Sequence, residues 1–290
     1  MRYFVIFSVM FLLFSCNENN NKKTTGDSES SAITEGKVSG NDFVAFSVPS
    51  PTMIASSIKL LEMDFNENLV FTSTTSKNDY PLSKDKAMNL GISLVDLGYA
   101  ALYNQNQTLI KMVGIVSKLT AELNIENKQI IEMTKKFEEN LNNQDSLMQL
   151  LHDVQSGIDK YYISEEKHEM ALLIVTGMFV EGLYFTCEYY KSLDKKKTSE
   201  KYFDALKQLL FQQRIHLSGI TELMDIYNKD EDYTEIKNML GEINEIFNSM
   251  SFSYTMDESG KNIQNVSFRR NYLPLLHEKV SKIRSELIAP

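Results

Sequence analysis

The sequence predicts an all-α protein, an antiparallel multi-helix bundle or helical array of about eight or nine helices. Pro (5) and Gly (12) are scarce in 290 residues, so few tight turns are available for a many-stranded sheet. Hydrophobic residues make up 42% of the chain, which is enough for a sizeable core. From residue 50 onward the apolar residues recur at helical spacing nearly throughout.

The N-terminal residues 1–15 are predicted to be a signal peptide. Arg2 provides a positive charge, and the segment Tyr3–Phe14 is apolar. A membrane-spanning helix needs about 20 apolar residues, so this segment is too short to span. Its length suits the hydrophobic region of an export signal.

The residues that follow resemble the lipobox of bacterial lipoproteins. Leu13 supplies the aliphatic residue three positions before Cys16, and Ser15 supplies the small residue just before it, although Phe14 is unusual between them. The resemblance implies that the Cys16 thiol receives a diacylglycerol, that cleavage follows Ser15, and that the new amine is acylated, with palmitate as the expected fatty acid. An ordinary secreted protein cut near Ser15 is the alternative.

Residues 16–48 are predicted to be the lipidated cysteine and a flexible tether, and residues 49–290 a single helical domain. The tether is rich in Asn, Lys, Thr, Ser and Gly, so it cannot form a core. About 25 flexible residues have an end-to-end distance of roughly 28 Å. The expected location is the cell envelope, on the outer membrane, with the periplasmic and outward-facing orientations left open.

The first five helices follow from caps and apolar spacing. Ser50 is expected to cap the first helix, with Pro51 in its first turn. A polar loop occupies Asp64–Pro81, and Ser83 is expected to cap a second helix that ends near Asn104. The first helix has apolar positions at Ile54, Ile58 and Leu61, and the third at Leu109, Met112, Val113, Val116, Leu119 and Leu123. The fourth has them at Ile130, Met133, Phe137 and Leu141, and the fifth at Leu147, Leu150, Leu151, Val154 and Ile158.

The sixth helix is the most apolar, and the seventh has the cleanest apolar spacing. Ser164 is expected to cap the sixth, whose apolar run Met170–Val180 is interrupted by Glu181 and predicts a buried core helix rather than a membrane span. The seventh has a seam with one polar position, Gln213, and packs either within the chain or against a second copy. The seam residues are Phe203, Leu206, Leu210, Gln213, Leu217, Ile220, Met224 and Tyr227.

The C-terminal region combines two more helices with a period-two segment. Asp232 and Glu235 form a predicted capping box before the eighth helix. Apolar residues alternate on both sides of Asp257–Gly260, which predicts a small hairpin or an ordered loop. The last helix runs from near Tyr272 to Leu287.

Two acidic residues in apolar helices define the candidate site. Asp96 and Glu181 each have a tyrosine three positions later, Tyr99 and Tyr184, on the same helix face. A buried carboxylate is costly without a partner, so each acid is expected to meet a tyrosine hydroxyl, a Lys or Arg, or helix-end amides. The four residues form either a satisfied polar network that sets helix register, or a ligand-binding or enzymatic pocket.

The same two helices carry a short internal sequence repeat. An acid, a Gly and a Tyr recur about 85 residues apart, which leaves open a duplicated three-helix unit. Gly91 and Gly98 in one helix, and Gly177 and Gly182 in the other, allow the two helices to approach closely. If these helices pack together, both acids meet in one polar core.

Several function classes are disfavoured. The net charge of −9 argues against nucleic-acid binding, which needs a concentrated basic face. His168 completes a single Glu-x-x-His pattern with Glu165, which is half of a di-iron motif. Cys187 lies in an apolar run and is expected to behave as a small hydrophobe. We therefore expect no catalytic residues, no metal and no cofactor.

Beyond the lipobox, the chain resembles a family of uncharacterised all-helical lipoproteins of bacteroidete-type bacteria. The resemblance implies an envelope lipoprotein and no activity. The leading hypothesis is a non-enzymatic binding or scaffold module, held at the membrane by its lipid and acting with an envelope protein partner; the oligomeric state is left open. The rival is a pocket around Asp96 and Glu181. The segments that carry the resemblance are Pro49-Ser50-Pro51, Ala87-Met88-Asn89-Leu90-Gly91, Asp96-Leu97-Gly98-Tyr99, Asp145-Ser146-Leu147 and Glu181-Gly182-Leu183-Tyr184.

Overall fold

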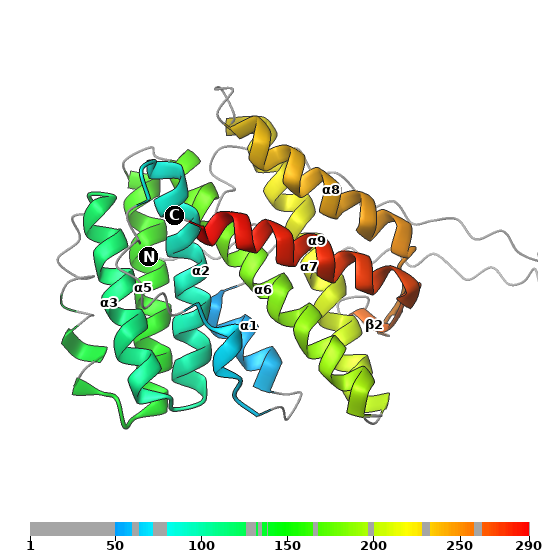
Figure 1. The fold of residues 1–290 in the computed structure, drawn as a ribbon, viewed down its shortest axis with the longest axis horizontal. Helices are drawn as coiled ribbons and strands as arrows, with labels where there is room; N and C mark the ends of the chain where they lie inside the picture. Colours follow the sequence, from blue (N-terminus) through cyan, green and yellow to red (C-terminus); the bar gives the residue numbers. More distant parts are fainter. Residues whose placement is uncertain are drawn as a thin grey trace, which may run out of the picture. The chain divides into compact units, whose positions relative to one another are not determined.

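Helices make up most of the part of the chain that the computed structural model describes (Figure 1). The predicted signal peptide, Cys16 and the tether lie outside the described residues, which belong to one compact unit, Gly40–Pro290. The all-α prediction is confirmed. The structure describes residues 50–59, 64–71, 80–125, 132, 135–137, 139–164, 168–196, 200–227, 233–257 and 263–289.

Eight α-helices have bounds within these described residues, together with two 3-10 turns and one hairpin. The helices are α1 (Pro51–Lys59), α2 (Ser83–Leu102), α3 (Asn106–Glu122), α5 (Gln144–Ser164), α6 (His168–Lys196), α7 (Glu200–Tyr227), α8 (Thr234–Met250) and α9 (Leu273–Ile288). The remaining elements are the 3-10 turns η2 (Glu67–Leu69) and η4 (Arg270–Tyr272) and the strands β1 (Ser253–Met256) and β2 (Ile263–Ser267).

Helices α2 and α6 form the centre of the domain. Helix α2 packs against α1, α3, α5 and α6, while α6 also contacts α7 and α9, and α9 runs across α6 (Figure 1). Glycines let the two central backbones touch: a Cβ on Gly91 would lie 2.0 Å from the Ile174 carbonyl oxygen, and one on Gly177 would lie 2.0 Å from that of Met88. The predicted close approach is therefore present at Gly91 and Gly177.

Helix α6 is the core helix that its apolar run predicts. Its segment His168–Leu193 is long and apolar enough to cross a membrane, but 89% of the apolar window is buried inside the domain. Along α7 the seam residues Leu206, Leu210 and Leu217 are also buried, against α6 and α8. This seam is therefore used within one chain, and the alternative of a dimer seam is not needed to bury it.

The helix ends match the predicted caps in part. Ser50 caps α1, because its Oγ accepts a hydrogen bond from the Met53 amide at 3.0 Å. The predicted Ser83 cap is wrong: Leu82 has the extended N-cap conformation, and its carbonyl accepts the first helical bond, from the Lys86 amide. Ser83 is already helical. The predicted capping residue Asp232 lies outside the described residues.

Of the two alternatives for the period-two segment, a small hairpin or an ordered loop, the structure has the hairpin. Strands β1 and β2 pair antiparallel, with Ser253 opposite Ser267, Met256 opposite Ile263, and an irregularity between Ser253 and Thr255. The predicted fourth helix falls mostly outside the described residues, although Phe137 from its stripe is buried in the core.

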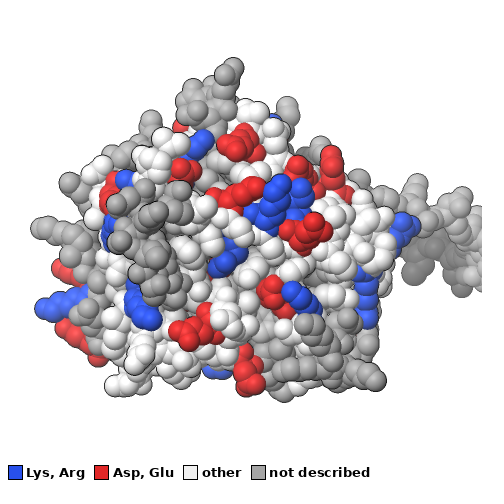
Figure 2. Space-filling view, in the orientation of Figure 1, with Lys and Arg blue, Asp and Glu red and all other residues white. Residues whose placement is uncertain are grey.

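Charged side chains are mixed rather than segregated on one face of the domain (Figure 2). Figure 2 shows acidic and basic groups interspersed on the face that it draws. Lys279 on α9 pairs with Glu242 on α8 at 2.7 Å, and Lys237 pairs with Asp225. Such exposed pairs contribute little to stability.

Candidate functional site

The candidate site is a buried cluster of two carboxyl groups and one guanidinium. Asp96 on α2 and Glu181 on α6 are both 0% exposed. Arg284 on α9 donates from Nε to Glu181 Oε2 at 2.6 Å and from Nη2 to Oε1 at 2.8 Å. This two-point geometry is the strongest form of carboxylate pairing. We call Asp96, Glu181 and Arg284 the acid–arginine cluster.

Arg284 reaches this cluster because it lies in the buried stripe of α9. Leu276, Val280 and Ile283 of that stripe are buried, and Arg284 follows Val280 by one helical turn, so it shares their face. Its Nη2 also donates to the Leu69 carbonyl oxygen at 2.9 Å. Arg284 was missed in the sequence, although a cation within an apolar stripe was the signal that could have found it.

One oxygen of Asp96 is bonded by a backbone amide rather than by the arginine. Its Oδ2 accepts a hydrogen bond from the Phe71 amide at 3.0 Å. Burial, and next the negative charge of Glu181, raise the pKa of Asp96 well above its usual range, against the opposing influence of Arg284 and the Phe71 amide. Asp96 therefore resists ionisation in the folded domain.

The two tyrosines of the predicted site have different surroundings. The Tyr184 ring lies under Arg284, with the guanidinium carbon 4.3 Å from the ring centroid, a cation–π contact. The Tyr99 hydroxyl instead bonds Tyr189 at 2.7 Å and accepts from the Asn66 amide at 2.9 Å. Tyr99 thus lies one turn from Asp96, but its hydroxyl is committed to other partners.

The structure therefore brings Asp96, Glu181 and Tyr184 together around Arg284 and directs Tyr99 elsewhere. Of the partners that the sequence left open, an arginine serves Glu181 and a backbone amide serves Asp96. Arg284 neutralises the charge of Glu181, and the cluster brings together one residue from each of α2, α6 and α9. It offers no exposed carboxylate to a substrate.

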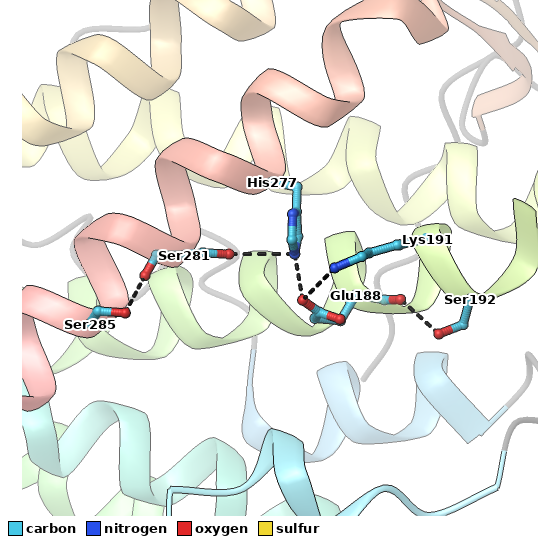
Figure 3. A network of polar contacts seen from close by, with 6 residues as sticks. All are labelled: Glu188, Lys191, Ser192, His277, Ser281 and Ser285. Atoms are coloured by element: carbon cyan, nitrogen blue, oxygen red, sulfur yellow. Dashed lines mark hydrogen bonds and ion pairs between the residues drawn. The ribbon is translucent and has the colours of Figure 1, made fainter. Parts of the chain in front are cut away.

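A second polar network joins α6 to α9 nearer the surface (Figure 3). Glu188 contacts His277 Nε2 and also pairs with Lys191 at 3.8 Å. The Ser281 hydroxyl lies 3.4 Å from the same His277 Nε2. A Ser-His-acid triad needs the acid and the nucleophile on opposite ring nitrogens, so this set is a bridge between helices rather than a triad.

Two further polar side chains of α7 are buried. Gln213 is fully buried and lies against Gly182 on α6. His216 is 7% exposed, and burial lowers its pKa from 6.5 to about 4. Gln213, the polar position in the predicted seam, therefore faces α6 within the domain.

His216 makes the folded domain sensitive to acid. The unfolded chain binds a proton on this histidine at pH values where the folded domain does not, so stability is lost as the pH falls from 6.5 toward 4. We expect His216→Phe to remove a contribution on the order of 2 kcal/mol to this loss. Urea unfolding at pH 7 and pH 5 measures it; an unchanged difference between the two pH values contradicts the assignment.

Two further kinds of chemistry, a reactive cysteine and a metal site, can be checked among the described residues. Cys187 is free and buried, and burial raises the pKa of its thiol, so the reactive thiolate is suppressed. Among the described residues, no three His, Cys, Asp or Glu side chains are grouped so that they could hold a metal ion.

Together the fold and the cluster define a class: an all-α helical array with two buried carboxyl groups at its centre, one of which is paired with an arginine of another helix. Comparison of the chain with protein-family models, curated proteins and solved structures finds no match.

Proposed function

We propose that this chain is a lipid-anchored lipoprotein of the bacterial cell envelope, and that its helical domain is a non-enzymatic binding or scaffold module. The lipobox-like Leu13–Cys16 segment and the polar residues after it support the anchor. Two or three acyl chains hold a protein stably at a bilayer, whereas one does not. The outer membrane, reached through an export signal, is the proposed location, and an envelope protein is the proposed partner.

One observation carries the non-enzymatic reading. Asp96 and Glu181 are completely buried, and Arg284 occupies both oxygens of Glu181. A pocket that binds or transforms a ligand needs polar groups that the ligand can reach. The residues that made a pocket conceivable therefore act as a link between helices, which favours a rigid module over an enzyme.

The anchor is tested by metabolic labelling with a fatty-acid probe in a bacterial host. We expect Cys16→Ser to abolish labelling and to leave the protein soluble after membrane fractionation, because the acylated thiol is lost. Cys187→Ser is the matched control, because this buried cysteine is not an expected lipid site, and it should label as the natural protein does. Full labelling of the Cys16→Ser variant would refute the anchor.

The binding role is tested separately from the anchor. Chemical cross-linking in intact cells should join the natural protein to one recurring envelope protein, and the Cys16→Ser variant should lose this partner because it leaves the membrane. The rival pocket makes a different prediction in a thermal-shift screen of small metabolites. A compound that raises the melting temperature of the natural protein but not of Asp96→Asn would favour the pocket and overturn the scaffold reading.

A further inference from the structure

A short segment is held against the cluster mainly through its backbone. We call residues 66–71 the strap. The Asn66 amide donates to the Tyr99 hydroxyl at 2.9 Å, the Leu69 carbonyl accepts from Arg284 at 2.9 Å, and the Phe71 amide donates to Asp96 at 3.0 Å. Two of these three long-range bonds therefore end on the acid–arginine cluster itself.

The charges of the cluster do not balance if every member is ionised. Asp96 and Glu181 would contribute two negative charges and Arg284 one positive charge, leaving a net charge of −1 in a site from which water is excluded. An uncompensated buried charge is strongly destabilising, and such a group binds a proton instead. One proton on a carboxyl group makes the cluster neutral.

Geometry places that proton on Asp96. Arg284 occupies both oxygens of Glu181, which marks Glu181 as the ionised member of the pair. Asp96 Oδ1 is buried and meets no donor among the described residues, yet Asp96 lies within hydrogen-bonding reach of Glu181. Two carboxyl groups share a hydrogen bond only when one of them is protonated.

The ionisable groups that act on Asp96 come from three helices. Tyr99 lies on the same helix, α2, Glu181 and Tyr184 lie on α6, and Arg284 lies on α9. Glu181 favours the protonated form of Asp96 and Arg284 opposes it, while burial disfavours the charged form most strongly. Burial and the neighbouring charges therefore favour a protonated Asp96, as the hydrogen-bonding geometry does.

Of the segments that form the site, the strap is expected to open at the lowest free energy. Leu69 and Val70 are its buried side chains, and its other side chains are exposed or half-buried. Helices α2 and α6 are instead locked together by backbone contact at Gly91 and Gly177. Segments with few buried apolar contacts open at the lowest free energy.

We propose that Asp96 carries a proton in the folded domain, that this proton bonds Glu181, and that opening of the strap releases it to solvent. The strap is then a pH-sensitive conformational device: opening becomes more favourable as the pH rises. This inference stands apart from the lipid anchor and from any partner, because it involves only residues of the helical domain.

The expected pH dependence follows from linkage. The closed state holds the proton on Asp96, and the open state, with Asp96 hydrated, does not. Between the ordinary pKa of an aspartic acid and the raised pKa of the closed state, the opening equilibrium constant should rise about tenfold for each pH unit. Above the raised pKa it should level off, because both states are then ionised.

Amide hydrogen exchange of the helical domain, with rates corrected for the intrinsic pH dependence of exchange, tests the device. We expect the protection factor of the Phe71 amide to fall about tenfold per pH unit within this window. The Phe179 amide of α6 should keep its protection. A Phe71 protection factor that does not change with pH, or that falls in parallel with that of Phe179, would overturn release of the strap.

Asp96→Asn is the variant that isolates the proton. The asparagine amide can donate to Glu181 while its oxygen accepts from Phe71, so it reproduces the protonated acid without the titration. We expect this variant to fold, to be at least as stable as the natural domain at pH 7, and to give a Phe71 protection factor that is independent of pH. The same pH slope in the variant would exclude Asp96 as the titrating group.

Infrared spectroscopy tests the proton without depending on strap motion. The natural domain should show the carbonyl stretching band of a protonated carboxylic acid at a pH where exposed acids are ionised. Asp96→Asn should lack this band. If the natural domain lacks this band at every pH above the ordinary pKa of exposed acids, the proposal that Asp96 is protonated is wrong.

Discussion

Replacing Gly91 with alanine is expected to destabilise the domain by about 3 kcal/mol or more. The new Cβ would lie 2.0 Å from the Ile174 carbonyl oxygen and 2.8 Å from the Met178 nitrogen. These are backbone atoms of a buried helix, so no side chain can rotate away, and α2 and α6 must separate. Gly177→Ala should cost about as much, because its Cβ would meet the Met88 backbone.

The chain provides matched controls for this steric argument. Gly114 on α3 and Gly241 on α8 are also helical glycines, but a Cβ at either position meets nothing within 4 Å. Gly114→Ala and Gly241→Ala should therefore stabilise the domain, by up to about 1 kcal/mol, through helix propensity. Denaturant unfolding of all four variants measures the contrast. A Gly91→Ala midpoint as high as that of Gly114→Ala would contradict the backbone contact between α2 and α6.

Replacing Arg284 with methionine is expected to destabilise the domain by about 3–5 kcal/mol. The change keeps the apolar stem of the side chain but leaves Glu181 without its two-point partner. It also removes the bond to the Leu69 carbonyl and the contact over the Tyr184 ring.

A second change distinguishes charge from packing. Adding Glu181→Gln to Arg284→Met removes both charges, so the double variant should recover a substantial part of the lost stability. Lys279→Met is the surface control on the same helix. Its partner Glu242 is exposed, so the unfolding midpoint of the Lys279→Met variant should not change measurably. A Lys279→Met loss equal to that of Arg284→Met would show that the burial of the cluster is energetically irrelevant.

These two predictions concern different kinds of interaction at the same helix pair. The Gly91 contact determines how closely α2 and α6 approach, and the cluster joins the same pair to α9 through Arg284. A register shift of α2 along α6 would bring a side chain into the glycine contact and separate Asp96 from Glu181. The buried polar cluster would thus favour one register of the two helices, at the cost of burying charge.

Much of the architecture could be predicted from local chemistry. The Ser50 cap, the buried α6, the α7 seam, the hairpin and the last helix all follow from spacing within a few residues, and the structure has each of them. Ser83 was misassigned as a cap because a serine before an apolar run looks the same whether it is the cap or the first helical residue. The difference depends on which carbonyl accepts the first helical bond, and that is Leu82.

The candidate site could be predicted in part. Asp96 and Glu181 stood out because each is an acid within an apolar run, and burial of a charge demands a partner. The partner itself was not predictable: Arg284 lies 103 residues from Glu181 along the chain, in a helix that also carries Lys279 and Lys282. Its place in the buried stripe of α9 sets Arg284 apart from these lysines, but nothing local shows which acid it meets.

The sequence by itself therefore determined most of the helices, their apolar faces and the need to neutralise two buried acids. Tertiary structure alone decided that Gly91 and Gly177 bring α2 and α6 into backbone contact, that Arg284 arrives from α9, and that the amide of Phe71 reaches Asp96. The physical reason is the separation along the chain of the residues that interact. Helix formation and capping depend on neighbours within about one turn, whereas charge pairing and close packing depend on which segments meet in three dimensions.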